Sequence, residues 1–163
     1  MVLKSKFKLR IFFPIALLVL ITGFIIISSK LILNDIKNAT LIVYLVIAFS
    51  IFLWIWLFFG ELRTKVIKIT IEEHEIIVSN YFGLQAKKVY LLSGFDGFKT
   101  SLMPARYQTY EFLYLMANDK KVIKLSGYYH KNYDDLKARL SLSLKDLGDE
   151  KFSLFSEVKE IFV

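Results

Sequence analysis

Two long stretches of apolar residues dominate the first 60 positions of the chain. Residues 11–29 form 19 consecutive positions without a charged side chain, and residues 39–60 form a second run of 22. About 20 apolar residues at a rise of 1.5 Å each cross the ~30 Å hydrocarbon core of a bilayer. A helix on a soluble core carries a polar stripe, and neither run has one. The pattern therefore predicts a two-helix transmembrane hairpin over residues 11–60.

The period changes from residue 64 onward to the alternation typical of strands. Ile67, Ile69 and Ile71 alternate with Val66, Lys68 and Thr70, so the isoleucines face one side of a strand. Similar short runs follow between turn residues. They predict antiparallel strands over residues 66–71, 76–82, 86–92, 95–102, 109–117 and 120–125.

A helical period returns at Asn132, which is a good N-cap. Asp134 and Asp135 lie in the first turn, where a helix favours negative charge. The apolar positions then fall on one helical face, namely Tyr133, Leu136, Leu140, Leu144 and Leu147. We expect a helix that ends at Gly148 and covers one opening of the sheet structure.

A shorter apolar stripe follows in the C-terminal segment, residues 149–163. Phe155, Val158 and Phe162 fall on one side of it. Such a stripe docks on its own domain, lies on the inner leaflet or binds a partner, and docking is the default interpretation. These three residues are the candidate contacts with a partner.

The distribution of charge predicts how the hairpin is oriented in the membrane. The formal net charge is +7, and residues 1–60 hold six basic side chains against one acid. Basic residues concentrate before the first helix and after the second, and basic flanks of membrane helices prefer the cytoplasmic side. We expect residues 1–10 to form a basic cytoplasmic N-terminus. Both termini are then on the cytoplasmic side of the bacterial inner membrane. The alternative of a cleaved signal peptide is disfavoured, because the first apolar run is long and no A-x-A site follows it.

The order of these elements resembles the bacterial pleckstrin-homology-like (PH-like) membrane proteins. The resemblance covers about residues 64–148. It is carried by the segments KITIEEHEIIVSNYFG (68–83), KKVYLLSGFDGF (87–98) and NYDDLKARL (132–140). It implies a membrane α-hairpin plus a small mainly-β domain, which is a split β-barrel or sandwich capped by a C-terminal α-helix. It implies no enzymatic activity, since related domains bind lipids, peptides or proteins.

The residues themselves indicate no catalysis either. The chain has no cysteine, and its two histidines, His74 and His130, have no partner at a metal-ligand spacing. Both are interpreted as exposed turn residues. Adjacent Asp134 and Asp135 are better explained by the helix start than by acid–base chemistry. We therefore expect no enzyme, no catalytic residues, no metal and no cofactor.

Lysines supply the candidate contacts with a lipid surface, and these are Lys65, Lys68, Lys87, Lys88, Lys120 and Lys121. Simple protection of strand edges is an alternative for the last four. Specific phosphoinositide binding is disfavoured, because the loop between the first two strands, residues 72–75, carries three carboxylates. Nucleic-acid binding is not expected either, since the basic charge concentrates in the membrane half.

Three functions remain open at this stage. The first is a membrane-anchored interaction module that binds a protein partner or self-associates at the cytoplasmic face. The second is an accessory subunit of a membrane transport or envelope-assembly complex. The third is a weak binder of anionic lipid surface. The bilayer, a protein partner and a second copy of the chain are thus the expected partners.

Overall fold

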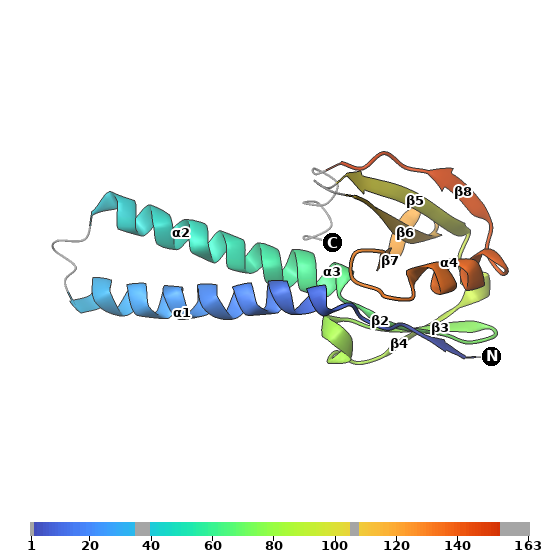
Figure 1. The fold of residues 1–163 in the computed structure, drawn as a ribbon, viewed down its shortest axis with the longest axis horizontal. Coiled ribbons are helices and arrows are strands. Elements are labelled where there is room, and N and C mark those ends of the chain that lie inside the picture. Colours follow the sequence, from blue (N-terminus) through green and yellow to red (C-terminus); the bar gives the residue numbers. More distant parts are fainter. Residues whose placement is uncertain (1, 35–39, 105–107, 154–163) are drawn as a thin grey trace.

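Two long helical segments lie side by side, and a β-domain is attached at one end of the pair (Figure 1). The structure, a computed structural model, describes residues 2–34, 40–104 and 108–153. Its helical segments are η1 (Leu9–Ile11), α1 (Phe12–Asn34), α2 (Leu41–Ile55), η3 (Trp56–Leu62), α3 (Arg63–Lys65), η4 (Tyr81–Gly83), η5 (Leu92–Gly94) and α4 (Tyr133–Ser141). Its strands are β1 (Leu3–Lys4), β2 (Lys68–Ile71), β3 (Glu75–Ser79), β4 (Lys88–Leu91), β5 (Gly97–Pro104), β6 (Thr109–Ala117), β7 (Lys120–Ser126) and β8 (Asp146–Asp149).

The helical pair is long and apolar enough to cross a membrane, judged by length and composition. Continuous helix runs over 26 residues, Leu9–Asn34, and over 25 residues, Leu41–Lys65. Few side chains in either helix are buried, unlike those of a core helix in a soluble protein. The Nε1–H of Trp54 donates a hydrogen bond to Thr22 Oγ1 at 2.9 Å and ties the two helices together. The predicted hairpin of two apolar helices is confirmed at this level.

Two four-stranded sheets form the β-domain. The first has the order β1-β2-β3-β4 and is antiparallel throughout. The second has the order β7-β6-β5-β8, with β8 parallel to β5. The core lies between the sheets and under α4, and its fully buried members include Ile69, Ile71, Ile76, Phe98, Leu113, Leu115, Leu125, Leu136 and Leu140. A helical hairpin followed by a small, mainly-β domain with a late helix is thus the observed architecture.

The start of the chain belongs to this domain. The prediction treated residues 1–10 as a basic flank, but Leu3 pairs with Ile71 across β1 and β2. The Ser5 N–H donates to the Ile69 carbonyl at 2.8 Å, and the Ile69 N–H donates to Ser5 Oγ at 2.9 Å. A two-residue strand is too short to show an alternating pattern. The chain therefore enters the first long helix from within the first sheet.

The C-terminal helix is shorter than its apolar spacing predicts. It ends at Ser141 rather than at Gly148, and residues 146–149 form β8 instead. The Phe98 N–H donates to the Lys145 carbonyl, and the Glu150 N–H donates to the Thr100 carbonyl. Leu144 packs in the core although it lies beyond the end of the helix. Its helical spacing from Leu140 is therefore a coincidence.

Candidate functional site

A cationic pocket opens between the two sheets, beside the last turn of the second long helix. It has a volume of about 340 Å³. Its walls come from α3, from the last residues of β3, from β4 and from β7. Four lining residues are cationic, and these are Arg63, Lys88, Lys121 and Lys124. No lining residue is acidic within the described parts of the chain.

Aromatic rings hold the innermost cation of the pocket. Lys124 is only 6% exposed. Its Nζ lies 4.6 Å from the ring centroid of Phe112 and 5.2 Å from that of Tyr114. Cation–π attraction of this kind is stronger where water is excluded. The positive charge is therefore fixed in position rather than carried on a mobile surface side chain.

Lys121 contributes to the pocket while pairing with an acid at its edge. Its Nζ lies 2.9 Å from Glu150 Oε1 and 4.2 Å from the Tyr114 ring centroid. Glu150 itself is not part of the lining. The carboxylate offsets part of the positive charge of Lys121.

The six lysines predicted to touch lipid have different environments in the structure. Lys88 and Lys121 line the pocket, whereas their neighbours Lys87 and Lys120 are exposed outside it. Lys120 and Lys121 are successive residues of β7 and therefore point to opposite faces, whereas Lys87 precedes β4. The other two predicted lysines, Lys65 and Lys68, lie outside the lining as well.

Arg63 and Lys124 were missed by the sequence analysis. Arg63 was considered only as a topology signal, and Lys124 follows an apolar pair within a strand. Simple alternation would put Lys121 and Lys124 on opposite faces of β7, but the strand has an irregular register at Val122, so that Lys121 pairs with Met116 and Lys124 with Tyr114 on one face. The predicted partner contacts Phe155, Val158 and Phe162 lie outside the described residues.

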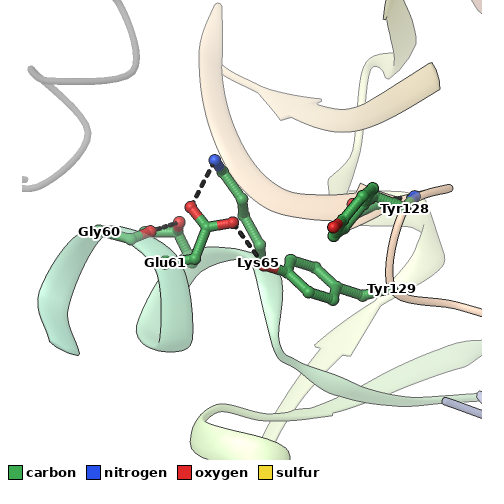
Figure 2. Close-up of polar contacts among 7 residues, drawn as sticks. Gly60, Glu61, Lys65, Tyr128 and Tyr129 are labelled. Carbon is green, nitrogen blue, oxygen red and sulfur yellow. Dashed lines mark hydrogen bonds and ion pairs between the residues drawn. The ribbon is translucent and has the colours of Figure 1, made fainter. Parts of the chain in front are cut away.

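A hydrogen-bonded junction joins the second long helix to the domain (Figure 2). The Tyr129 hydroxyl donates to Glu61 Oε1 at 2.6 Å, and Lys65 Nζ lies 2.8 Å from Glu61 Oε2. Tyr129 is 3% exposed. Burial, and then the charge of Glu61, raise the pKa of the Tyr129 phenol far above its ordinary value, so the hydroxyl stays a donor. The carboxylate thus has a donor on each oxygen.

The first long helix is joined to the same loop. Arg10 lies over the rings of Tyr110 and Tyr128, with Cζ at 5.5 and 5.3 Å from their centroids. Its guanidinium also donates a hydrogen bond to the Tyr110 hydroxyl. The Nζ of Lys8 donates to the Gly127 carbonyl at 2.6 Å. Basic residues predicted as a topology signal therefore also attach the helix to the domain.

His130 is fully buried, so its interpretation as an exposed turn residue was wrong. Its Nε2 lies 2.9 Å from the Ile67 carbonyl oxygen, and its Nδ1 lies 3.0 Å from that of Ser126. Phe7 covers the ring at a centroid distance of 5.3 Å. Burial lowers the pKa of His130, against the opposing effect of the two carbonyl contacts. Two of its partners, Ile67 and Phe7, are far away in sequence, so the polar segment around it gave no signal of burial.

A second cavity of about 330 Å³ lies beside the start of α4. Its charged residues largely satisfy one another. Glu111 Oε1 accepts a hydrogen bond from the Tyr133 hydroxyl at 2.6 Å and lies 2.7 Å from Lys137 Nζ. We assign it a structural role.

The described residues contain no cluster of three or more histidine or acidic side chains that could hold a metal ion. The cationic pocket is thus the candidate site. A comparison of the chain with known protein families, characterised proteins and solved structures finds no match.

Proposed function

We propose that this chain is a membrane-anchored, non-catalytic interaction module that binds a protein partner or a second copy at the membrane surface. One observation carries the proposal: both ends of the helical hairpin are built into the same β-domain. Lys8 and Arg10 attach the first helix, and Glu61 attaches the second. A domain held in this way cannot swing freely, so it presents one constant surface along the bilayer.

The orientation follows from the same attachment. Since the two helices enter one domain, residues 2–8 and the β-domain lie on the same side of the membrane. Basic side chains gather at that end, and positive flanks favour the cytoplasm. We therefore place the domain at the cytoplasmic face of the bacterial inner membrane. The lack of cysteine makes this testable by labelling single cysteines at Leu33, near the hairpin tip, and at Leu142, in the domain.

An impermeant maleimide should label the cysteine of Leu33→Cys in intact spheroplasts and that of Leu142→Cys only after the membrane is broken. Both side chains are more than 70% exposed, so access to the two sites is matched. The reverse pattern would put the domain outside, and labelling of both sites in intact cells would reject the transmembrane hairpin.

We also propose that the domain is PH-like. Two facing sheets, with a helix late in the chain packed against their core, support this interpretation. Two features depart from the expected pattern. The first strand precedes the hairpin, and β8 adds a parallel strand beside β5.

Crosslinking in native membranes tests the interaction itself. Lysine-reactive crosslinking, detergent purification and mass spectrometry should recover the chain in a discrete adduct. A different protein in constant ratio supports the accessory-subunit form of the proposal, for a transport or envelope-assembly complex. Adducts of this chain alone, in a defined multiple, support self-association. Recovery of the uncrosslinked chain only would reject a protein-binding module.

A further inference from the structure

We infer that the aromatic loop, residues 80–85 between β3 and β4, contacts the lipid bilayer and attaches the domain to the membrane beside the two helices. The inference rests on the membrane placement proposed above. It concerns contact with lipid alone, so it does not depend on which protein the module binds.

Two apolar side chains stand exposed on the aromatic loop. Leu84 is 87% exposed, more than any other large hydrophobic side chain among the described residues, and Phe82 is 42% exposed. Single exposed leucines are common on soluble proteins, so exposure alone indicates no partner. The kind of partner follows instead from what the neighbouring rings contact.

One side of the aromatic loop packs on the second long helix, within its uncharged run. The ring centroid of Tyr81 lies 5.0 Å from that of Phe58, and Phe58 in turn stacks on Trp54 at 5.1 Å. Phe58 comes two residues before Gly60, the last residue of the uncharged run. Aromatic rings at such a position are typical of the interface between membrane and water. The loop therefore lies level with the membrane end of the domain.

The other side of the aromatic loop meets the start of the first long helix. Phe82 stacks on Phe7 at a centroid distance of 4.7 Å. The continuous helix begins two residues later at Leu9, which is 84% exposed. In Figure 1 the loop is the light-green segment beside the domain end of α1, on the side from which the helices leave. It therefore extends the apolar surface of the hairpin sideways along the bilayer.

The backbone of the aromatic loop suits surroundings that are poor in water. All four N–H groups of residues 82–85 donate hydrogen bonds to backbone carbonyls, at 2.8–3.3 Å. Unpaired N–H groups are costly to move toward the hydrocarbon of a bilayer, and this cost is absent here. The acceptor for Phe82 is Val66, which connects α3 to β2. The loop is thus fixed relative to the membrane helix.

An unusual backbone conformation directs the two rings to different helices. Tyr81 and Phe82 have φ angles of 50° and 63°, and Gly83 follows at 93°. Residues other than glycine disfavour this left-handed region, and they keep it where the surrounding contacts hold them. Here the contacts are the rings of Phe58 and Phe7. The membrane helices themselves therefore hold the loop in shape.

The charge near the aromatic loop also suits a headgroup layer. Residues 80–91 include Lys87 and Lys88 but no acidic residue, so they present no carboxylate for anionic lipids to repel. The stem of Lys68 lies across Gly83, since a Cβ on Gly83 would come within 2.9 Å of its Cδ. Lysines that lay an apolar stem on the protein and keep the charge in water are favoured at membrane interfaces.

Fluorescent labels at three exposed leucines test the contact, because the chain has no cysteine of its own. Leu84→Cys reports on the aromatic loop, Leu20→Cys on the first long helix and Leu142→Cys on the segment after α4. The native side chains are 87%, 70% and 78% exposed, so the three sites are matched. Leu20 lies nine residues beyond Ile11, about 14 Å along the helix axis and near the middle of the ~30 Å hydrocarbon core.

Full-length protein carrying an environment-sensitive fluorophore would be reconstituted in nanodiscs of phosphatidylcholine and phosphatidylglycerol. The nanodiscs would contain a lipid with a nitroxide quencher, either near the headgroup end of its acyl chain or near the chain end. We expect the label at Leu84 to emit at shorter wavelength than that at Leu142 and to be quenched more by the shallow nitroxide than by the deep one. The label at Leu20 should be quenched more by the deep nitroxide, and that at Leu142 by neither.

The three labels separate the ways in which the inference can fail. Quenching at Leu20 but not at Leu84 would overturn it and leave the membrane placement standing. Emission at shorter wavelength from Leu84 without quenching by lipid would assign the aromatic loop to a protein interface, and equal quenching at Leu84 and Leu142 would attribute the effect to the fluorophore; both overturn the inference. Absence of quenching at Leu20 would reject the membrane placement itself, and the inference with it.

Discussion

The attachment of the β-domain to the second long helix depends on a single phenol. Tyr129→Phe keeps the buried ring and removes only the hydroxyl that donates to Glu61. A hydrogen bond to a charged group contributes about 1.5–3 kcal/mol. Glu61 keeps Lys65 as a partner on its other oxygen, so the carboxylate is not left alone. We therefore expect a loss of about 2 kcal/mol in the free energy of unfolding of the domain.

Tyr128→Phe is the control for this change. Tyr128 is the neighbouring residue, its ring packs on Tyr129 at 4.7 Å, and its hydroxyl has no hydrogen-bond partner among the described residues. We expect its removal to cost less than about 0.5 kcal/mol. Urea unfolding of the full chain in detergent micelles, followed by near-UV circular dichroism, would measure both variants.

A double-mutant cycle with Glu61→Gln separates the direct contact from general repacking. If Tyr129 and Glu61 interact as described, the two changes together should cost at least about 0.5 kcal/mol less than the sum of their separate costs. The reasoning would be refuted if Tyr129→Phe and Tyr128→Phe were equally stable, or if the costs at Tyr129 and Glu61 were simply additive.

Three further variants test other parts of the fold. The pKa of His130 lies below its ordinary value of 6.5, so the unfolded chain takes up the proton first as the pH falls. The free energy of unfolding should therefore drop below about pH 6.5, by at most about 1.4 kcal/mol per pH unit. Unfolding measured at pH 7.5 and 5.5 should depend less on pH for His130→Gln than for the wild type, whereas His74→Gln should behave as the wild type does. Equal pH dependence in His130→Gln and the wild type would contradict the burial of His130. In Gly97→Ala the new Cβ would lie 2.3 Å from the Lys145 carbonyl oxygen. It should displace β8 at a cost of about 1–3 kcal/mol and speed hydrogen exchange at the Phe98 amide, whereas Gly94→Ala, with open space around it, should not. Ser5→Ala leaves the buried Ile69 N–H unpaired and should lower the free energy of unfolding in urea by about 1–3 kcal/mol. The control Ser141→Ala changes an exposed residue and should cost less than about 0.5 kcal/mol. Similar losses for both variants would contradict the pairing of residues 3–5 with the sheet.

Local patterns in the sequence were enough to predict the main elements. The two uncharged runs predicted the helices, and the strand predicted over residues 109–117 coincides with β6. The turn at Asn118 and Asp119 also agrees, since both residues have positive φ, as tight hairpin turns require. These features depend on neighbours within a few positions along the chain.

Features that depend on distant partners could not be predicted in the same way. Asn132 has the sequence of an N-cap, yet its side chain makes no capping hydrogen bond. Its Oδ1 accepts from the Lys6 N–H at 2.7 Å, and its Nδ2 donates to the Lys4 carbonyl at 3.0 Å. The burial of His130 likewise depends on Phe7 and Ile67. The contacts of Lys4, Lys6 and Phe7 join segments separated by the whole helical hairpin, and that of Ile67 joins segments 63 residues apart.

The lysines of the pocket could be predicted from the sequence only in part. Strand alternation requires that Lys120 and Lys121, which both lie in β7, point to opposite faces, whereas Lys87 precedes β4. The sequence could therefore separate Lys120 from Lys121, but it could not state which of the two lines the pocket. That choice depends on the register of β6 with β7, in which Lys121 pairs with Met116.

The connection between helix and domain limits how the domain can move relative to the bilayer. Only Val66 and Ile67 separate α3 from β2, and they are 1% and 3% exposed, so the linker is itself part of the core. A flexible linker of ten residues would let a domain range over roughly 15–20 Å. That range exceeds the thickness of the headgroup layer, so a tethered domain would average its contacts over the whole bilayer surface. In the proposed orientation the domain instead keeps one height above the bilayer, which favours a partner that is itself held at the membrane.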